Sequence, residues 1–171
     1  NNDQFSSMVC NDSILWILAT HGNVILKIQN DTIINYKPEF LKNRYYGFFE
    51  YCIDEKGKLW FQYSEKDTTQ KDEYFGYKEI YKIAYFNGVF FSDYPIPEQL
   101  SKNVFTSFII NKDILYFTGY HIKKDRYEPP VYLYILNNLE LDSIKLGNNP
   151  ILRPSFYIYN DSISVYSSND K

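Results

Sequence analysis

One short pattern recurs four times along this chain, and its repetition constrains the fold more than any other feature. A polar turn feeds a run of large apolar residues at 11–17, 54–63, 111–117 and, in a weaker form, 160–166. With the large residue at 16, 60, 116 and 165 as the marker of each copy, successive copies lie 44, 56 and 49 residues apart. Periods of about 40 to 50 residues are typical of propeller blades, small sheets that need neighbours to bury both faces.

The segments between the turns indicate strands rather than helices. They are short runs rich in β-branched and aromatic residues, and Asn, Asp, Gly and Pro end them. We therefore predict an all-β chain, one β-propeller segment over residues 1–171 built of four-stranded antiparallel blades. The blades are expected at about 5–36, 46–94 and 104–146, with a partial one at 156–166. About three and a half blades leave the ring unclosed within this chain, so we expect a larger ring, formed by a longer polypeptide or by another copy.

Composition argues against two classes of partner. The formal net charge is −3 and the isoelectric point is near 5.4, whereas phosphate binding needs clustered Lys and Arg, so no nucleic-acid partner is predicted. No apolar run approaches the roughly 18 residues of a membrane span, and no membrane contact by this segment is predicted. The aromatic content of 19% is compatible with a stacking surface, but it is also what tyrosine-rich strands require.

The two cysteines, Cys10 and Cys52, fall at the ends of equivalent first strands. A thiol in that position is expected to behave as a small buried hydrophobic group. A disulfide between neighbouring blades stays open, and so does the redox compartment. The chain begins at Asn1 without a Met or a leader, so the sequence leaves the compartment of the parent protein undecided.

Residues 54–60 read Asp-Glu-Lys-Gly-Lys-Leu-Trp. This resembles the Asp-x-x-Gly-x-Leu-Trp signature of the propeller repeats in two-component regulators of Bacteroidetes, whose sensor regions are large periplasmic propellers. Looser copies keep Leu15-Trp16 and Leu115-Tyr116, and the Gly-Thr pair that the signature expects soon after Trp is absent from the first two copies. The resemblance implies a periplasmic or extracellular sensor in signal transduction that responds to carbohydrate, with signalling through a change in blade or dimer arrangement.

The long connections predict where binding takes place. In a propeller, the connections from second to third strands emerge on one rim, and here two of them are long, at 64–77 and 121–130. Loops on a rigid scaffold usually carry binding, although length variation is tolerated on any exposed loop. The candidate ligand-binding residues on this rim are Tyr74, Phe75, Tyr77, Arg126 and Tyr127.

Glu50 is a further candidate, because it falls in a first strand, which lines the central channel of a propeller. Its carboxylate could bind the hydroxyls or cation of a ligand, or it could face channel water. The histidines His21 and His121 occupy equivalent positions after their markers, and Glu65 is their counterpart in the second unit. Equivalent positions of separate blades are held apart, so no metal site is predicted.

No Ser or Cys elbow, no His placed as a base and no Gly-rich phosphate cradle is recognisable. Catalytic residues and cofactors are therefore predicted to be absent, and the favoured hypothesis is a non-enzymatic recognition module with an oligosaccharide ligand. The alternatives are a scaffold for a protein partner, self-association through open sheet edges, and a carbohydrate-active enzyme that uses Glu50 or an acid of the rim.

Overall fold

A computed structural model of the chain describes residues 5–19, 24–36, 50–67, 69, 78–100, 103–123, 126–147, 154–159 and 162–167. These residues are strands almost throughout, and the short 3-10 helix η2 (Glu98–Leu100) interrupts them once. Within these ranges no helix is long and apolar enough to cross a membrane. The all-β prediction is confirmed.

The strands form four separate antiparallel sheets, in the order β1-β2-β3-β4, β5-β6-β7-β8, β9-β10-β11-β12 and β13-β14. Each sheet is therefore a meander of strands consecutive in sequence. Their bounds are β1 (Phe5–Cys10), β2 (Leu15–Ala19), β3 (Val24–Gln29), β4 (Thr32–Tyr36), β5 (Tyr51–Ile53), β6 (Leu59–Asp67), β7 (Lys78–Phe86), β8 (Phe91–Tyr94), β9 (Asn103–Asn111), β10 (Ile114–Lys123), β11 (Arg126–Asn137), β12 (Glu140–Gly147), β13 (Pro154–Tyr159) and β14 (Ser162–Ser167).

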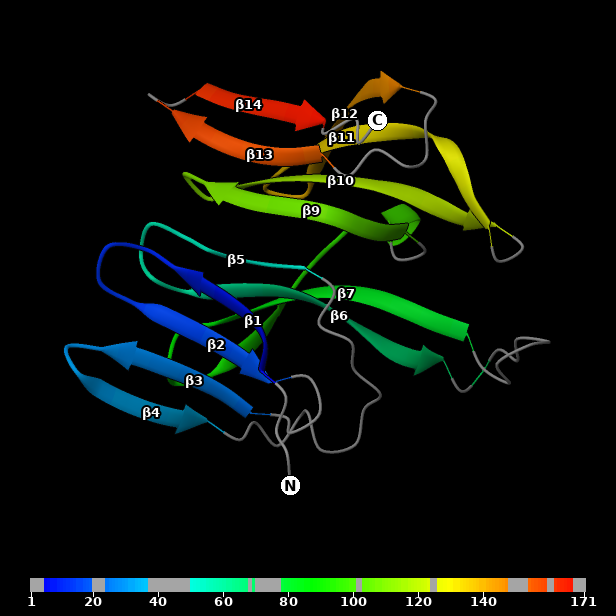
Figure 1. Ribbon diagram of the computed structural model, residues 1–171. Coiled ribbons are helices and arrows are strands. Elements are labelled where there is room, and N and C mark those ends of the chain that lie inside the picture. Colours follow the sequence, from blue (N-terminus) through cyan, green and yellow to red (C-terminus); the bar gives the residue numbers. More distant parts are fainter. Residues whose placement is uncertain are drawn as a thin grey trace.

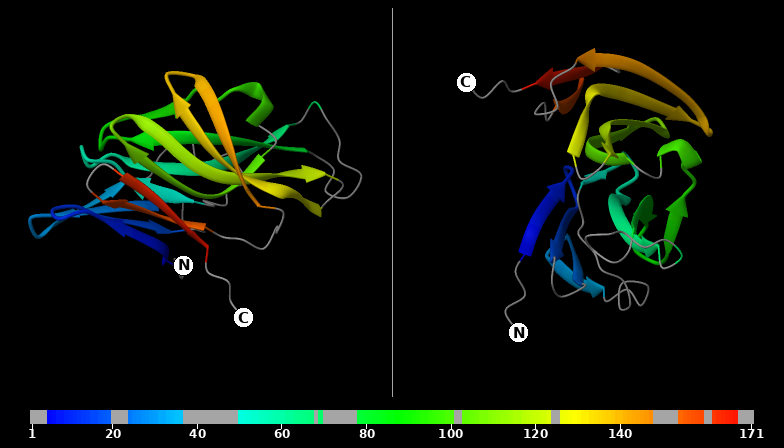
Figure 2. Two further views of the ribbon diagram at one scale, coloured as in Figure 1. Left: turned by 90° about the horizontal axis from the view of Figure 1, so that it is seen from above. Right: turned by 90° about the vertical axis from the view of Figure 1, so that its right-hand side faces the viewer.

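The sheets are arranged as blades around an arc. Their first strands lie next to one another, β1 against β5, β5 against β9, and β9 against β13 (Figure 1). Seen along the strands, the first and the last sheet stand at the two ends of the arc (Figure 2, right). The chain is thus an open propeller segment of three four-stranded blades and one two-stranded blade, as the repeat predicted.

Tight turns fix the register inside the blades. Two-residue turns at Asn30-Asp31, Lys112-Asp113 and Asn138-Leu139 have both residues at positive φ. This positive-φ conformation matches the twist of the strands that the turn joins. Gly adopts it most readily, and Asn and Asp adopt it more readily than other residues with a side chain. Hairpin turns rich in these residues therefore define the ends of the strands.

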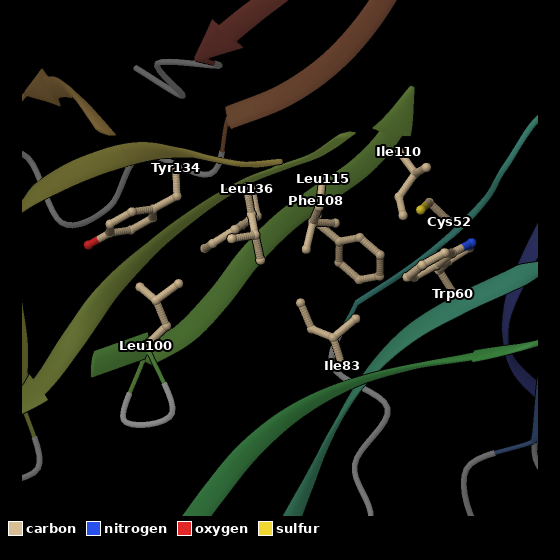
Figure 3. Packing of buried hydrophobic residues seen from close by; sticks show 10 residues of the cluster. Cys52, Trp60, Ile83, Leu100, Phe108, Ile110, Leu115, Tyr134 and Leu136 are labelled. Atoms are coloured by element: carbon tan, nitrogen blue, oxygen red, sulfur yellow. The ribbon is translucent and has the colours of Figure 1, made fainter. Parts of the chain in front are cut away.

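The core lies between the blades, in two clusters. The first junction joins the first and second sheets through buried residues of β2, β3, β6 and β7, namely Trp16, Leu18, Ile25, Leu59, Phe61, Tyr63, Ala84 and Phe86. The second junction joins the second and third sheets through Cys52, Trp60, Ile83, Leu100, Phe108, Ile110, Leu115, Phe117, Tyr134 and Leu136. In Figure 3 Cys52, Trp60 and Ile83 converge on Phe108 and Ile110. Blades that share their cores in this way stabilise one another.

The third blade corrects the prediction made for its long connection. The segment 121–130, predicted as a loop, is mostly strand, because β10 continues to Lys123 and β11 begins at Arg126. The third strand of this blade therefore begins inside the segment predicted as a connection, and the prolines Pro129 and Pro130 lie within β11. In the second blade β6 likewise runs on to Asp67.

The two cysteines differ, which corrects one half of the prediction. Cys52 is buried in the second junction, where desolvation raises the pKa of its thiol well above the ordinary value. Cys10 is exposed instead, because it lies on the face of the first sheet that points away from the second. Both are free thiols.

Candidate functional site

The signature around Asp54 is a structural device. Asp54 is buried, and its Oδ1 accepts hydrogen bonds from the backbone N–H groups of Lys56 and Lys58, both at 2.9 Å. Its Oδ2 accepts a third, from Trp60 Nε1 at 2.9 Å. A buried carboxylate needs such donors. The Asp, the Gly and the Trp of the motif therefore hold a turn, and the signature does not itself form a binding site.

The same turns also link neighbouring blades. Trp16 Nε1 of the first blade donates to the carbonyl oxygen of Gly57 in the second at 3.2 Å. On the next blade the backbone N–H of Lys112 donates to Glu55 Oε1 at 2.9 Å, and Lys56 Nζ lies 3.1 Å from both Asp113 oxygens. This end of the blades is thus occupied by contacts that maintain the fold.

The opposite end carries the elaborated rim, built from hairpins. The β6–β7 and β10–β11 hairpins both extend beyond their blades on the side away from the signature turns (Figure 1). Arg126 and Tyr127 open β11, where they pair with Lys123 and Ile122 of β10. Tyr74, Phe75 and Tyr77 lie outside the described residues.

A polar cluster lies on the second blade near this rim, and we call it the blade-two cluster. It consists of Tyr63 and Glu65 of β6, Lys82 of β7 and Asp93 of β8. The buried Tyr63 hydroxyl donates to Asp93 Oδ1 at 2.6 Å. Lys82 Nζ lies 2.6 Å from Glu65 Oε2 and 3.7 Å from Asp93 Oδ2. One ammonium is therefore held between two carboxylates, over a tyrosine that belongs to the first junction.

The local folding explains this arrangement. Tyr63 pairs with Lys82, and Ala84 pairs with Asp93, so all four polar side chains project from the face of the sheet that carries Leu59 and Phe61. Apolar packing fills that face near the signature turns and gives way to charge toward the rim. The side chains of Lys82 and Asp93 are 34% and 56% exposed, so both reach solvent, whereas Tyr63 is buried and the side chain of Glu65 is only 19% exposed.

The chemistry of the cluster favours binding. Carboxylate oxygens accept and the ammonium donates, and a group that carries several hydroxyls offers partners for both. The Lys82 ammonium is committed to two acids, so it is not set up as a nucleophile. Within the described residues no group of three or more His, Cys, Asp or Glu side chains could hold a metal ion.

Glu50 stands immediately before β5 and is half-buried. Its carbonyl oxygen accepts the backbone N–H of Gln62 at 2.8 Å, so its backbone continues the ladder of the innermost strand of the second blade. The role of its carboxylate stays a prediction. His121 lies in β10 and pairs with Glu128, and His21 lies outside the described residues.

Sequence reasoning missed most of the blade-two cluster. It named only Glu65, and only as the counterpart of the histidines. Lys82 interrupts the apolar run 80–86, and Asp93 follows Phe90-Phe91-Ser92 in β8. A charge inside an otherwise apolar strand needs a partner, and that requirement was the available signal.

Comparison of the sequence with models of protein families finds no match, and none of the curated proteins searched matches it either.

Proposed function

We propose that this propeller segment is a non-enzymatic recognition module, and that its ligand is an oligosaccharide bound at the rim, where it contacts the blade-two cluster. The blade-two cluster carries the proposal, because it presents fixed donors and acceptors beside tyrosine. Sugar hydroxyls both donate and accept hydrogen bonds, so they suit a set that contains an ammonium and two carboxylates. The rim residues Arg126 and Tyr127 belong to the same end of the molecule.

The biological setting follows from the resemblance of residues 54–60 to sensor propellers. In that setting the module belongs to the periplasmic or extracellular part of a signalling protein, and the ligand is a breakdown product of a polysaccharide. Rigid blades suit this role, because a ligand that bridges two hairpins changes the relation between blades without unfolding either.

A protein-interaction scaffold is the second candidate, and one observation favours it. Val89 and Phe90, in the turn between β7 and β8, are 86% and 51% exposed. Two adjacent apolar side chains at the tip of a turn are a typical anchor for a protein partner. They lie on the end of the blade opposite to the blade-two cluster, so the two candidates involve different surfaces.

Glycan-array screening followed by calorimetry with the best oligosaccharide tests the proposal. Asp93→Asn keeps an acceptor for Tyr63 but removes one of the charges next to Lys82, and it is expected to weaken binding about tenfold or more. The control is Asp113→Asn, which disrupts a lysine–aspartate pair at the opposite end of the blades, and it should leave affinity unchanged.

Other outcomes of these experiments would favour a protein scaffold or an enzyme instead. An array without any bound glycan, together with a protein partner that is lost on Val89→Asp, would replace the proposal by the scaffold. Release of shorter sugars that Glu50→Gln abolishes would make the chain an enzyme.

A further inference from the structure

The two junctions between blades follow one rule. In the first junction Trp16 and Leu18 of β2 meet Leu59 and Phe61 of β6. In the second, Trp60 of β6 meets Leu115 and Phe117 of β10. Alternate residues of a strand point to opposite faces. Each blade therefore shows a face with a central aromatic residue to the next blade, and a face of Leu and Phe type to the previous one.

The first blade also has a face of Leu and Phe type, and no described part of the chain covers it. Leu15 and Ile17 are the counterparts of Leu59 and Phe61, and the ladder aligns them with side chains of β1, β3 and β4. This first end face consists of Met8, Cys10, Leu15, Ile17, Leu26, Ile28, Ile33 and Asn35. Met8 and Ile33 are each 66% exposed, and no residue of the face belongs to the first junction.

The pairing of β13 with β14 shows which residues of the last blade face the preceding blade. Tyr159 pairs with Ser162 as Asn111 pairs with Ile114 in the third blade. Counted from these pairs, Val165 and its partner Phe156 correspond to Phe117 and its partner Phe108, which face the preceding blade. The comparison of the repeat copies in the sequence, which took Val165 as the counterpart of Tyr116, is therefore one residue out of register.

The opposite face of the last blade, the last end face, carries three exposed tyrosines. Tyr157, Tyr159 and Tyr166 are 60%, 75% and 59% exposed, and the rings of Tyr157 and Tyr166 meet edge to face with centroids 5.4 Å apart. Ser162 and Ser164 complete it. By the rule of the junctions, this is the face that a following blade would cover with Leu and Phe type residues.

We propose that a second copy of this chain docks head to tail, its last end face packing on the first end face. Both halves of a junction are present on one chain, at the two ends of the arc (Figure 2, right). Neither end face carries a charged side chain, although 23% of the residues are charged. Depletion of charge and enrichment in tyrosine mark the core of an interface. A heterologous contact closes into a ring only where the rotation between copies completes the circle. Two chains of three four-stranded blades and one two-stranded blade each supply about the number of blades that propellers close with, so we expect a dimer with two identical junctions.

Sedimentation of the full 171-residue chain over a range of concentrations tests this. The wild type is expected to form dimers, and Met8→Glu and Tyr159→Glu should each raise the dissociation constant about 100-fold or more, since each buries a charge in both contacts. Both sites are exposed in the single chain, so circular dichroism should show an unchanged fold. Leu139→Glu introduces the same charge at an exposed apolar site in the turn between β11 and β12, away from both faces, and is expected to leave the dissociation constant within about twofold.

Mixing the two variants tests the head-to-tail geometry. A Met8→Glu chain keeps its last end face and a Tyr159→Glu chain keeps its first, so an equimolar mixture should recover one junction and associate more tightly than either variant alone. A symmetric contact of like faces would not recover on mixing and would contradict the proposal. A wild type that stays monomeric at every concentration would overturn it.

Thiol labelling gives an independent readout. Cys10 lies on the first end face and is exposed, whereas Cys52 is buried with a raised pKa and serves as the unreactive reference. Labelling of Cys10 should slow as wild-type concentration rises, and should not slow for Tyr159→Glu, whose substitution lies in another sheet. Labelling of Cys10 that is independent of concentration in a dimeric wild type would place the contact elsewhere and overturn the proposal.

Discussion

Asp54 shows why one turn in this chain uses a carboxylate where others use an amide. Asn11 Oδ1 accepts the backbone N–H groups of Ser13 and Ile14 at 3.1 and 2.9 Å, and Asn87 does the same for Val89 and Phe90. One acceptor oxygen is enough for those turns. Asp54 has a further donor to satisfy, the indole N–H of Trp60, and an amide nitrogen cannot accept it.

Replacing Asp54 by Asn should therefore destabilise the protein. The amide oxygen can keep the two backbone bonds, but its NH₂ group would face the indole N–H, and we expect a loss of about 2 kcal/mol in the free energy of unfolding. Urea unfolding measures this. In a Trp60→Phe background, where the donor is gone, the same substitution should cost at least about 1 kcal/mol less.

The control is Asn11→Asp, whose turn has no indole donor and is expected to change stability by less than about 0.5 kcal/mol. Equal costs of Asp54→Asn in the two backgrounds would show that the indole bond is not the reason for the carboxylate.

Among the elements, the hairpins show where sequence suffices and where it does not. The first blade was predictable because Asn30-Asp31 signals a turn, and the runs of β2 and β3 end at polar residues. The extent of β10 and β11 was not, because Lys123, Arg126 and the two prolines of β11 are poor strand formers taken singly. Hydrogen-bonded pairing between β10 and β11 outweighs those preferences. The preferences of individual residues do not reveal which strands will pair.

The turn between β11 and β12 is the least well suited to its conformation. Leu139 sits at φ +72° and Asn138 at φ +47°, so a side chain with a bulky Cβ substituent occupies a position that Gly favours. Leu139→Gly should raise the free energy of unfolding by about 1 kcal/mol, because Leu139 is 54% exposed and gives up little packing. Thermal unfolding should show a rise of roughly 2–4 °C.

Leu139→Ala is the matched control, because it removes the same packing and keeps the Cβ. It is expected to gain little or to lose stability slightly. A gain as large as that of Leu139→Gly would mean that the leucine side chain, and not the backbone conformation, is the source of strain.

At the scale of the whole molecule, the repeat predicted an open ring of blades, but the placement of the binding side chains depends on contacts between strands. The blade-two cluster joins three strands of one sheet, and its residues 63 and 93 lie 30 positions apart. Spacing in the sequence does not encode such a meeting. The junctions are similarly hidden, because Trp16 donates across 41 positions to a backbone carbonyl, a partner that every residue offers.

Gly57 packs closely against Ile14 of the first blade, and this contact allows the packing of the two blades to be measured. A Cβ at Gly57 would lie 2.6 Å from Ile14 Cδ1, and the residue has φ +78°. Gly57→Ala should therefore cost about 2–3 kcal/mol, the sum of the left-handed backbone conformation and the clash. Ile14→Val removes the clashing Cδ1, so in that background the cost should fall by about 1 kcal/mol.

Gly88→Ala separates the two contributions. Gly88 has φ +95°, but the nearest atom to its Cβ would be Tyr36 Oη at 3.6 Å, an ordinary contact. The loss in the free energy of unfolding on Gly88→Ala should therefore come from the backbone conformation alone, about 1–2 kcal/mol. This loss should be the same in the Ile14→Val background. Chemical unfolding of the double-mutant cycle measures both couplings. If Gly57→Ala costs the same with either residue at position 14, the contact of Gly57 with Ile14 does not limit the packing of the blades, and the first junction then rests on its buried core and on the hydrogen bond from Trp16 to Gly57.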